Sequence, residues 1–529
     1  MAFLKRLLLH ALSGLLFAAA FPPFHQWWLA WFWLLPLLFI LWAENPRRGG
    51  KLAWFGFRQG WLTGLFAFTA TLWWAGHVTV PGMIALCCYL ALFPALWCAF
   101  AAAVRPHSPA QGFAAAAGLA LLWTGLEWVR SWLLTGFPWN GAATPLIEMP
   151  GLRALAAWTG VTGLAAVPLF FMTGIAAAWT LRRHRQTRTL ALLLCTALAL
   201  PAILTLLLWE KTSPAAGRVA VLLVQPNVPM DIKMNLDLAA YPPEEQQALA
   251  DQRELERYQD LATLTLEGIA KAKEKPLLTV WPESALPRLY HDSSHKELFS
   301  KMFAAGTQAL ITGCDALTAA ESGSDAWLAH NCLALIHQSP ENFVLHAKVH
   351  LVPFGEYIPL RKQLPFLEKM LGDLIPTDFA AGKSLEPLHF KDMPFQVIPL
   401  VCFEDTIAHL ARKFVRDAPQ LIVNVTNDNW FHESNESAIH ALNARWRCIE
   451  LDRPMIRAAN TGVTCVIDTE GRITSELPRW KAGSLFASVP YHKGGITFYA
   501  AHGEVIAASA GAVGLLLLIA LLFQRRSQP

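Results

Sequence analysis

Three side chains that could do acid–base or nucleophilic chemistry lie at or just after short apolar runs of the sequence. Glu283 follows Val280-Trp281-Pro282, Lys348 lies in the run 344–350, and Cys402 directly follows the run 397–401. A carboxylate can act as a general base, an ammonium group can stabilise an oxyanion, and a thiolate can attack a carbonyl carbon. The sequence therefore offers a base, a cation and a nucleophile, which meet only if the fold brings them together.

The position of Cys402 predicts a junction between a strand and a helix. An amphipathic pattern begins near Asp405, so helix N-terminal amides would lie close to the thiol and, with Lys348, favour the thiolate. Plainer alternatives remain open for all three residues. Cys402 could be a buried structural cysteine, Glu283 an acid at a helix N-terminus, and Lys348 a solvated residue of a strand edge.

The elements that would carry these residues alternate along the polar part of the chain. Short β-rich runs predict strands at 219–224, 276–280, 310–313, 332–337, 344–350, 396–401, 421–425 and 465–468. Charged stretches with helical periodicity predict helices at 244–273, 294–305, 404–416 and 436–450. Alternating helices and strands indicate an α/β or α+β layered sheet domain.

The composition excludes a purely soluble globular chain and a disordered one. Of 529 residues, 54% are hydrophobic and only 16% are charged, against roughly a quarter charged in soluble domains. A membrane span needs about 20 apolar residues. Eight candidate spans follow, at 7–24, 27–43, 57–77, 82–104, 112–134, 155–180, 189–209 and 503–523. The net charge of +4 is not clustered, so nucleic acid is not an expected partner.

Lys and Arg are concentrated in alternate connections between the candidate spans. They precede span one and follow spans two, four, six and eight, whereas the loops after spans one and three have neither. This bias predicts cytoplasmic termini and places 211–502 on the far side, in a bacterium the periplasm. The expected domains are a seven-span domain at 1–210, a catalytic domain at 211–500 and an eighth helix with a tail at 501–529.

Span five contains two charges, Glu127 and Arg130, three residues apart and therefore on one helical face. One interpretation is a mutual ion pair near the interface, and the other is the wall of a lipid site.

The ordered motifs of the polar region resemble those of the nitrilase, or carbon–nitrogen hydrolase, superfamily. They are Trp281-Pro282-Glu283-Ser284, then Lys348-x-His350-Leu351-Val352-Pro353-Phe354-Gly355-Glu356, then Cys402-Phe403-Glu404, and Asn424-x-x-Asn427-Asp428-x-Trp430-Phe431. The seven spans before them, the Thr135-Gly136-Phe137-Pro138-Trp139 segment and the terminal span resemble the bacterial apolipoprotein N-acyltransferases. The resemblance covers nearly the whole chain.

This resemblance implies an αββα sandwich and a Glu-Lys-Cys triad of Glu283, Lys348 and Cys402. It implies acyl transfer from a membrane phospholipid, typically phosphatidylethanolamine, through a Cys402 thioester. The acceptor would be the α-amino group of a diacylglyceryl-cysteine at a lipoprotein N-terminus. No metal or soluble cofactor is implied, because a thioester already stores the activation. The enzyme would be a monomer of the bacterial inner membrane.

The resemblance also assigns supporting positions. Glu356 and Glu404 would be additional acids around the triad, Asn331 a polar site residue, and Phe431 an aromatic of the site wall or a mobile loop. A backbone amide near Phe403 would help hold the oxyanion. Packing or turn structure is the plain alternative for each. Two departures from relatives are Phe403, where the family often has Tyr, and Met234, where some have Trp.

Apolar residues between 355 and 380, around Leu364-Pro365-Phe366-Leu367 and Met370-Leu371, would dip toward the bilayer or simply pack within their loop. A membrane-tethered amidase that hydrolyses a small amide would carry the same triad, and a transporter or receptor with a silent outer domain is the alternative outside enzymes.

Overall fold

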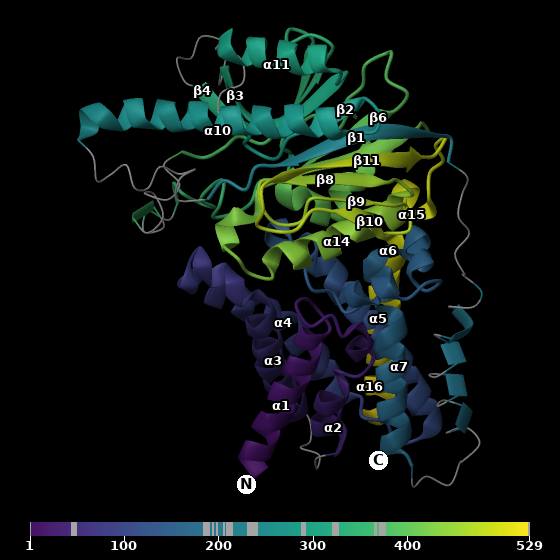
Figure 1. Ribbon diagram of the computed structural model, residues 1–529. Coiled ribbons are helices and arrows are strands. Elements are labelled where there is room, and N and C mark those ends of the chain that lie inside the picture. The colour runs from purple at the N-terminus through teal and green to yellow at the C-terminus, as the bar shows by residue number, and fades with distance from the viewer. Residues whose placement is uncertain are drawn as a thin grey trace. The chain divides into compact units, whose positions relative to one another are not determined.

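The computed structural model divides the chain into two compact units. One, here the helical unit, comprises 1–212, 434–450 and 497–529. The other comprises 213–433 and 451–496 and is here called the catalytic unit, because the three candidate residues Glu283, Lys348 and Cys402 lie in it. Each is described by itself (Figure 1). The structure describes residues 2–43, 50–182, 215–229, 242–286, 293–319, 327–363 and 377–526, with scattered positions between 191 and 207 and at 365, 368 and 369.

The helical unit consists of apolar helices joined by short 3-10 turns. Its main helices are α1 (Ala2–Ala19), α2 (Leu35–Ala43), α3 (Gly50–Leu72), α4 (Val80–Ala103), α5 (Pro109–Arg130), α6 (Ala156–Leu164), α7 (Ala166–Thr180), α15 (Phe498–His502) and α16 (Val505–Arg526). Helix α14 (Glu436–Leu451) belongs to it up to Glu450. Short 3-10 helices lie at Trp27–Trp31, Trp73–His77, Leu133–Thr135, Thr144–Glu148 and Arg153–Leu155.

Glycine allows the closest helix contacts of this unit. In α3 a Cβ at Gly60 would lie 2.3 Å from the carbonyl oxygen of Pro94 in α4. Where α5 meets α16, a Cβ at Gly125 would lie 2.4 Å from the Cα of Gly511. Small residues let backbones approach in this way, and this is how apolar helices pack where water does not drive their association.

The helices confirm a candidate membrane region, although not every expected span. Among the described residues, α4, α5 and α16 are long and apolar enough to cross a membrane. The bent pair Arg153–Leu164 and Ala166–Thr180 would make a fourth span. The stretch 27–43 differs from a single span, because a 3-10 helix and the short α2 are separated by a turn. In α3, Lys51, Arg58 and Gln59 lower the mean hydropathy. The expected span 189–209 lies largely outside the described residues, so the count of eight stays a prediction.

Two β-sheets form the catalytic unit. The six-stranded sheet has the order β11-β1-β2-β3-β4-β5 and the five-stranded sheet the order β10-β9-β8-β7-β6. The first contains β1 (Gly217–Gln225), β2 (Leu278–Val280), β3 (Ala309–Ala319), β4 (Trp327–His337), β5 (Phe343–Ala347) and β11 (Gly483–Tyr491). The second contains β6 (Gln396–Val401), β7 (Gln420–Thr426), β8 (Met455–Ala459), β9 (Cys465–Ile467) and β10 (Ile473–Glu476).

Apolar side chains fill two layers around these sheets. Val221, Leu335, Val397 and Val423 belong to the core between the two sheets. On its other face the six-stranded sheet packs against α10 (Pro243–Lys271) and α11 (Ser293–Ala305), through a second core that includes Trp281 (Figure 1). The expected α/β layered domain is therefore confirmed, and the central strands, such as β2, β7 and β8, are fully buried.

One predicted helix and the three strands that were not predicted show where local pattern misleads. Residues 404–416 form no continuous helix but a 3-10 turn at Cys402–Thr406, a four-residue α13 (Ala408–Ala411) and a second 3-10 turn at Arg412–Phe414. Strands β8, β10 and β11 were not expected.

Candidate active site

Cys402 lies at the carboxyl end of β6, where the chain turns sharply. Its φ is +53°, in the left-handed region that few residues other than glycine adopt. The Asn424 side chain of the neighbouring strand β7 holds this turn, since its Nδ2 donates to the carbonyl oxygens of Cys402 at 3.0 Å and Leu400 at 3.4 Å. A strained turn that ends a buried strand is a known way to present a nucleophile.

Glu283 lies in the turn that follows β2 and is 7% exposed. The backbone of β3 approaches this turn closely, because the amide of Gly313 donates to the carbonyl of Pro282 at 3.1 Å. A Cβ at position 313 would lie 2.5 Å from the Cα of Glu283. Gly313 therefore sets how near the glutamate lies to the sheet.

A network of hydrogen bonds joins Glu283 to Lys348. Asn331 Nδ2 in β4 donates to Glu283 Oε1 at 2.8 Å and to Glu356 Oε1 at 2.9 Å. Lys348 Nζ donates to the same Glu356 oxygen at 2.9 Å and lies 3.9 Å from Glu283 Oε1. Lys348 is 1% exposed, so its charge depends on these partners.

Glu404, two residues after Cys402, is fully buried and holds the loop after β5 in place. Its Oε1 accepts from the amides of Val349 and His350, and its Oε2 from the amide of Val401, each at 2.8 Å. Glu356 adds a similar contact, since its Oε2 accepts from the amide of Val352 at 2.8 Å. The two carboxylates therefore fix the loop that carries Lys348.

The electrostatics correct the expectation of a resting thiolate. Burial, followed by the carboxylate of Glu283, raises the pKa of Cys402 well above its usual range, and Lys348 opposes the shift without overcoming it. A 3-10 helix, Cys402–Thr406, stands at this turn in place of the expected α-helix. The group at rest is a neutral thiol that needs a base when it reacts.

Neighbouring groups are perturbed for related reasons. Burial works to lower the pKa of Lys348, but the carboxylates of Glu356 and Glu283 oppose it, and the net direction is upward, so the group stays charged. Burial raises the pKa of Glu404 to about 7 despite Lys348 and the three amides. Burial, followed by Lys348, lowers the pKa of His350 to about 4 and keeps this ring neutral.

The two aromatic positions of the resemblance have different surroundings. Phe403 stacks on His350 with ring centroids 6.0 Å apart, and Phe431 ends the 3-10 helix Asp428–Phe431, where it is partly exposed. Met234 and the apolar positions 364, 366, 367, 370 and 371 lie outside the described residues.

Sequence reasoning did not find Arg457, a fully buried residue of β8. Its guanidinium contacts Asp428 Oδ2 at 3.2 Å and Asp405 Oδ2 at 3.5 Å. Asp428 also accepts from Thr426 Oγ1 at 2.9 Å, and Asp428 is one of the carboxylates that raise the pKa of Cys402. In the sequence, only its acidic partners Asp405 and Asp428 could have suggested that a buried cation lies nearby.

Two family models match parts of the chain in both units. Residues 13–174 match the family described as Apolipoprotein N-acyltransferase N-terminal domain, and residues 223–494 match Carbon-nitrogen hydrolase. An amidase from Nesterenkonia sp. AN1 is 15% identical, with 52% of this chain and 93% of that chain covered, but its TM-score of 0.34 is too low to bear on the fold or the chemistry.

Curated relatives named apolipoprotein N-acyltransferase match along nearly the whole chain. The protein from Geobacter metallireducens is 31% identical over 98% of this chain and 96% of its own length. Those from Rhizobium rhizogenes and Chlorobaculum tepidum are 31% and 28% identical over 89% and 98% of this chain, and 87% and 97% of their own lengths. The chain belongs to the apolipoprotein N-acyltransferase family, with a carbon–nitrogen hydrolase domain as its catalytic unit.

Proposed function

We propose that this protein transfers an acyl chain from a membrane phospholipid to the α-amino group of a lipoprotein N-terminal diacylglyceryl-cysteine, in two steps. Glu283, Lys348 and Cys402 would carry the chemistry, and a phosphatidylethanolamine-like lipid would be the donor. The observation that carries the proposal is the network of Glu283, Asn331, Glu356 and Lys348 beside the Cys402 thiol.

In the first step the Cys402 sulfur attacks the carbonyl carbon of the acyl ester. Glu283 takes the thiol proton as the carbon–sulfur bond forms, so the raised thiol pKa is no obstacle. Lys348, kept charged by Glu356, stabilises the oxyanion, with a backbone amide near Phe403 as its second partner. When the carbon–oxygen bond breaks, Glu283 gives the proton to the leaving oxygen, and a lysophospholipid leaves.

In the second step the acceptor amine attacks the thioester. Glu283 takes the amine proton, the new amide bond forms and the carbon–sulfur bond breaks. Cys402 leaves as a thiolate and recovers the proton. Because the lysophospholipid leaves before the amine attacks the thioester, the reaction follows a ping-pong order, and the thioester itself makes an activating cofactor unnecessary.

The apolar helices give such an enzyme a physical advantage. Both substrates are anchored in a membrane, so a catalytic unit held at the same surface raises their effective concentration. We propose that the termini are cytoplasmic and the catalytic unit lies on the periplasmic side of the bacterial inner membrane. We further propose a monomer and retain the domain boundaries 1–210, 211–500 and 501–529.

The test is the intact mass of the full-length protein in detergent after mixing with phosphatidylethanolamine and no acceptor. We expect one added acyl mass that neutral hydroxylamine removes and that a diacylglyceryl-cysteine peptide discharges. Cys402→Ala should show no adduct, whereas Cys195→Ala, at an exposed cysteine, should match the wild type. A folded protein without an adduct would contradict the proposal and favour hydrolysis of a small amide.

A further inference from the structure

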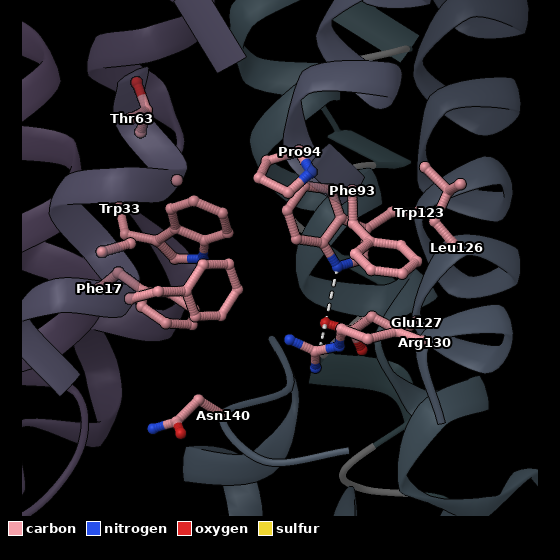
Figure 2. Close-up of a pocket in the computed structure, with 13 residues that line it drawn as sticks. Phe17, Trp33, Thr63, Phe93, Pro94, Trp123, Leu126, Glu127, Arg130 and Asn140 are labelled. Atoms are coloured by element: carbon pink, nitrogen blue, oxygen red, sulfur yellow. Dashed lines mark hydrogen bonds and ion pairs between the residues drawn. The ribbon is translucent and has the colours of Figure 1, made fainter. Parts of the chain in front are cut away.

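A cleft lies within the helical unit. It is formed by α1, α3, α4 and α5 with the turn before α2 and the loop after α5, and it encloses about 460 Å³ including its open mouth. Little of this space is wide enough for a water molecule. Its walls are mostly apolar and include the ring of Phe68. Figure 2 shows four further aromatic rings of the lining, those of Phe17, Trp33, Phe93 and Trp123.

One end of the cleft is polar and charged. Arg130 and Asn140 are 3% and 1% exposed, and both lie beyond the aromatic rings in Figure 2. Among the described residues, no partner is found for Arg130 Nε, for Trp33 Nε1, or for either polar atom of the Asn140 carboxamide. Three buried donors and one buried acceptor therefore face a space that holds no protein group to satisfy them.

Glu127 does not satisfy these donors. Its Oε1 already accepts from Trp123 Nε1 and from the amide of Ala142, both at 2.8 Å, and it lies 4.0 Å from Arg130 Nη2. Because Glu127 holds the loop after α5 through Ala142, Asn140 is kept at the edge of the cleft. The ion pair of the two charged residues is thus loose, and the guanidinium retains capacity for another acceptor.

A purely structural pair explains this arrangement poorly. Burying an unsatisfied polar group costs roughly 1–3 kcal/mol, and buried charges inside a membrane region mark functional sites by default. A bound water would satisfy some of the donors, but it would not account for an aromatic cleft that leads to them. Apolar walls with a few convergent polar groups are instead typical of a small-molecule site.

We propose that this cleft binds one acyl chain whose oxygen-rich head, an ester, phosphate or carboxylate, accepts from Arg130, Trp33 and Asn140. The acyl chain lies among the aromatic rings, which turn aside to admit it, and a hydroxyl or amine of the head donates to Asn140 Oδ1. Binding at this site does not depend on thioester chemistry. A phospholipid and a free fatty acid both carry the required chemistry.

The test uses photolabelling of the full-length Cys402→Ala protein in detergent, which prevents turnover. The probes are phosphatidylethanolamine and palmitic acid, each with a diazirine on the acyl chain, and crosslinks are mapped by peptide mass spectrometry. We expect labels on peptides of α1, α4 and α5 that contain Phe17, Phe93 and Trp123. Labelling by both probes assigns the site to any acyl carboxylate or ester, and labelling by the phospholipid alone assigns it to the phosphate.

Two variants test the polar end. Asn140→Gly keeps the left-handed backbone, with φ +56°, and removes the carboxamide. Trp33→Phe removes the indole N–H donor and keeps an aromatic ring at this position. Trp28→Phe, at a tryptophan that is 48% exposed, is its matched control. We expect at least tenfold less labelling in Asn140→Gly, a severalfold loss in Trp33→Phe and no change in Trp28→Phe.

Labels absent from the cleft of a folded protein, or unchanged in both variants, would overturn the proposal. Because Cys402 is already replaced, the result is independent of the proposed triad. A wild-type protein that is labelled in the cleft but forms no thioester would overturn the proposed reaction and leave the proposed cleft site standing.

Discussion

Replacing Gly313 by alanine should slow acylation of Cys402 while leaving most of the sheet intact. The added Cβ would lie 2.5 Å from the Cα of Glu283, 2.6 Å from the amide of Ser284 and 2.7 Å from the carbonyl of Pro282. All three neighbours are backbone atoms, so no side chain can rotate away. Since carbon atoms in contact lie about 3.5–4 Å apart, the turn that carries Glu283 must move by roughly 1 Å.

The magnitude follows from this displacement. A misplacement of about 1 Å in a catalytic group costs on the order of 100-fold in rate, and overpacking costs about 1–3 kcal/mol of stability. The assay is the single-turnover rate of acyl adduct formation with phosphatidylethanolamine, followed by intact mass. Thermal unfolding of the same sample measures the loss of stability.

Gly483→Ala is the matched control, because it lies in β11 of the same sheet. A Cβ there would meet only Leu477 Cδ2, at an ordinary 3.8 Å. We expect an unchanged rate and a stability equal to the wild type or up to about 1 kcal/mol higher, since alanine in a strand loses less entropy on folding than glycine. Acylation of Gly313→Ala at the wild-type rate would refute the role given to the close approach of β3 and Glu283.

Three further changes follow from the site. Glu356→Gln must turn an amide NH₂ toward at least one of three donors, Lys348, Asn331 or the Val352 amide. We therefore expect a free energy of unfolding about 3 kcal/mol lower, measured with denaturant. The exposed Glu386→Gln should leave stability unchanged, and equal losses in both variants would contradict this reasoning. The pKa of Glu404 rises from 4.5 to about 7 on folding, so the folded state binds the extra proton between these values. Its contribution to stability should therefore decrease by about 3 kcal/mol as the pH rises from 4.5 to 7, and Glu404→Gln should abolish that part of the pH dependence of Tm; identical profiles would exclude it. Because the pKa of Cys402 is raised, iodoacetamide at pH 8 should alkylate it more slowly than the exposed Cys195, and a faster reaction at Cys402 would indicate a thiolate at rest.

The sequence was sufficient to predict the strands that end at Glu283 and Cys402, because their apolar runs fill the cores on both faces of a sheet. It was insufficient for the segment that follows Cys402. There the Glu404 carboxylate takes the amides of Val349 and His350, more than fifty residues earlier, and the chain stays in a 3-10 turn. An amphipathic pattern reflects which residues are exposed and contains no information on hydrogen bonds to distant segments. The pattern after Cys402 therefore predicted a helix that does not form.

The thiol pKa and Arg457 were out of reach for a similar reason. Whether Lys348 or burial dominates at Cys402 depends on how much water reaches the sulfur, which no local pattern records. Arg457 lies in a strand that was not predicted, and its two aspartates come from different turns. Both features are products of assembly between segments far apart in the chain.

The pairing of β1 with β11 has a consequence for biosynthesis. Gly217 lies opposite Tyr491, so the first and last strands of the catalytic unit are neighbours in one sheet. Strand β1 therefore waits for its outer partner until the ribosome has added more than 260 residues, about 15–50 s at roughly 5–20 residues per second. During that interval one edge of β1 is open to wrong partners. Maturation of the sheet is thus timed by the arrival of β11, just before the terminal helix α16 is made.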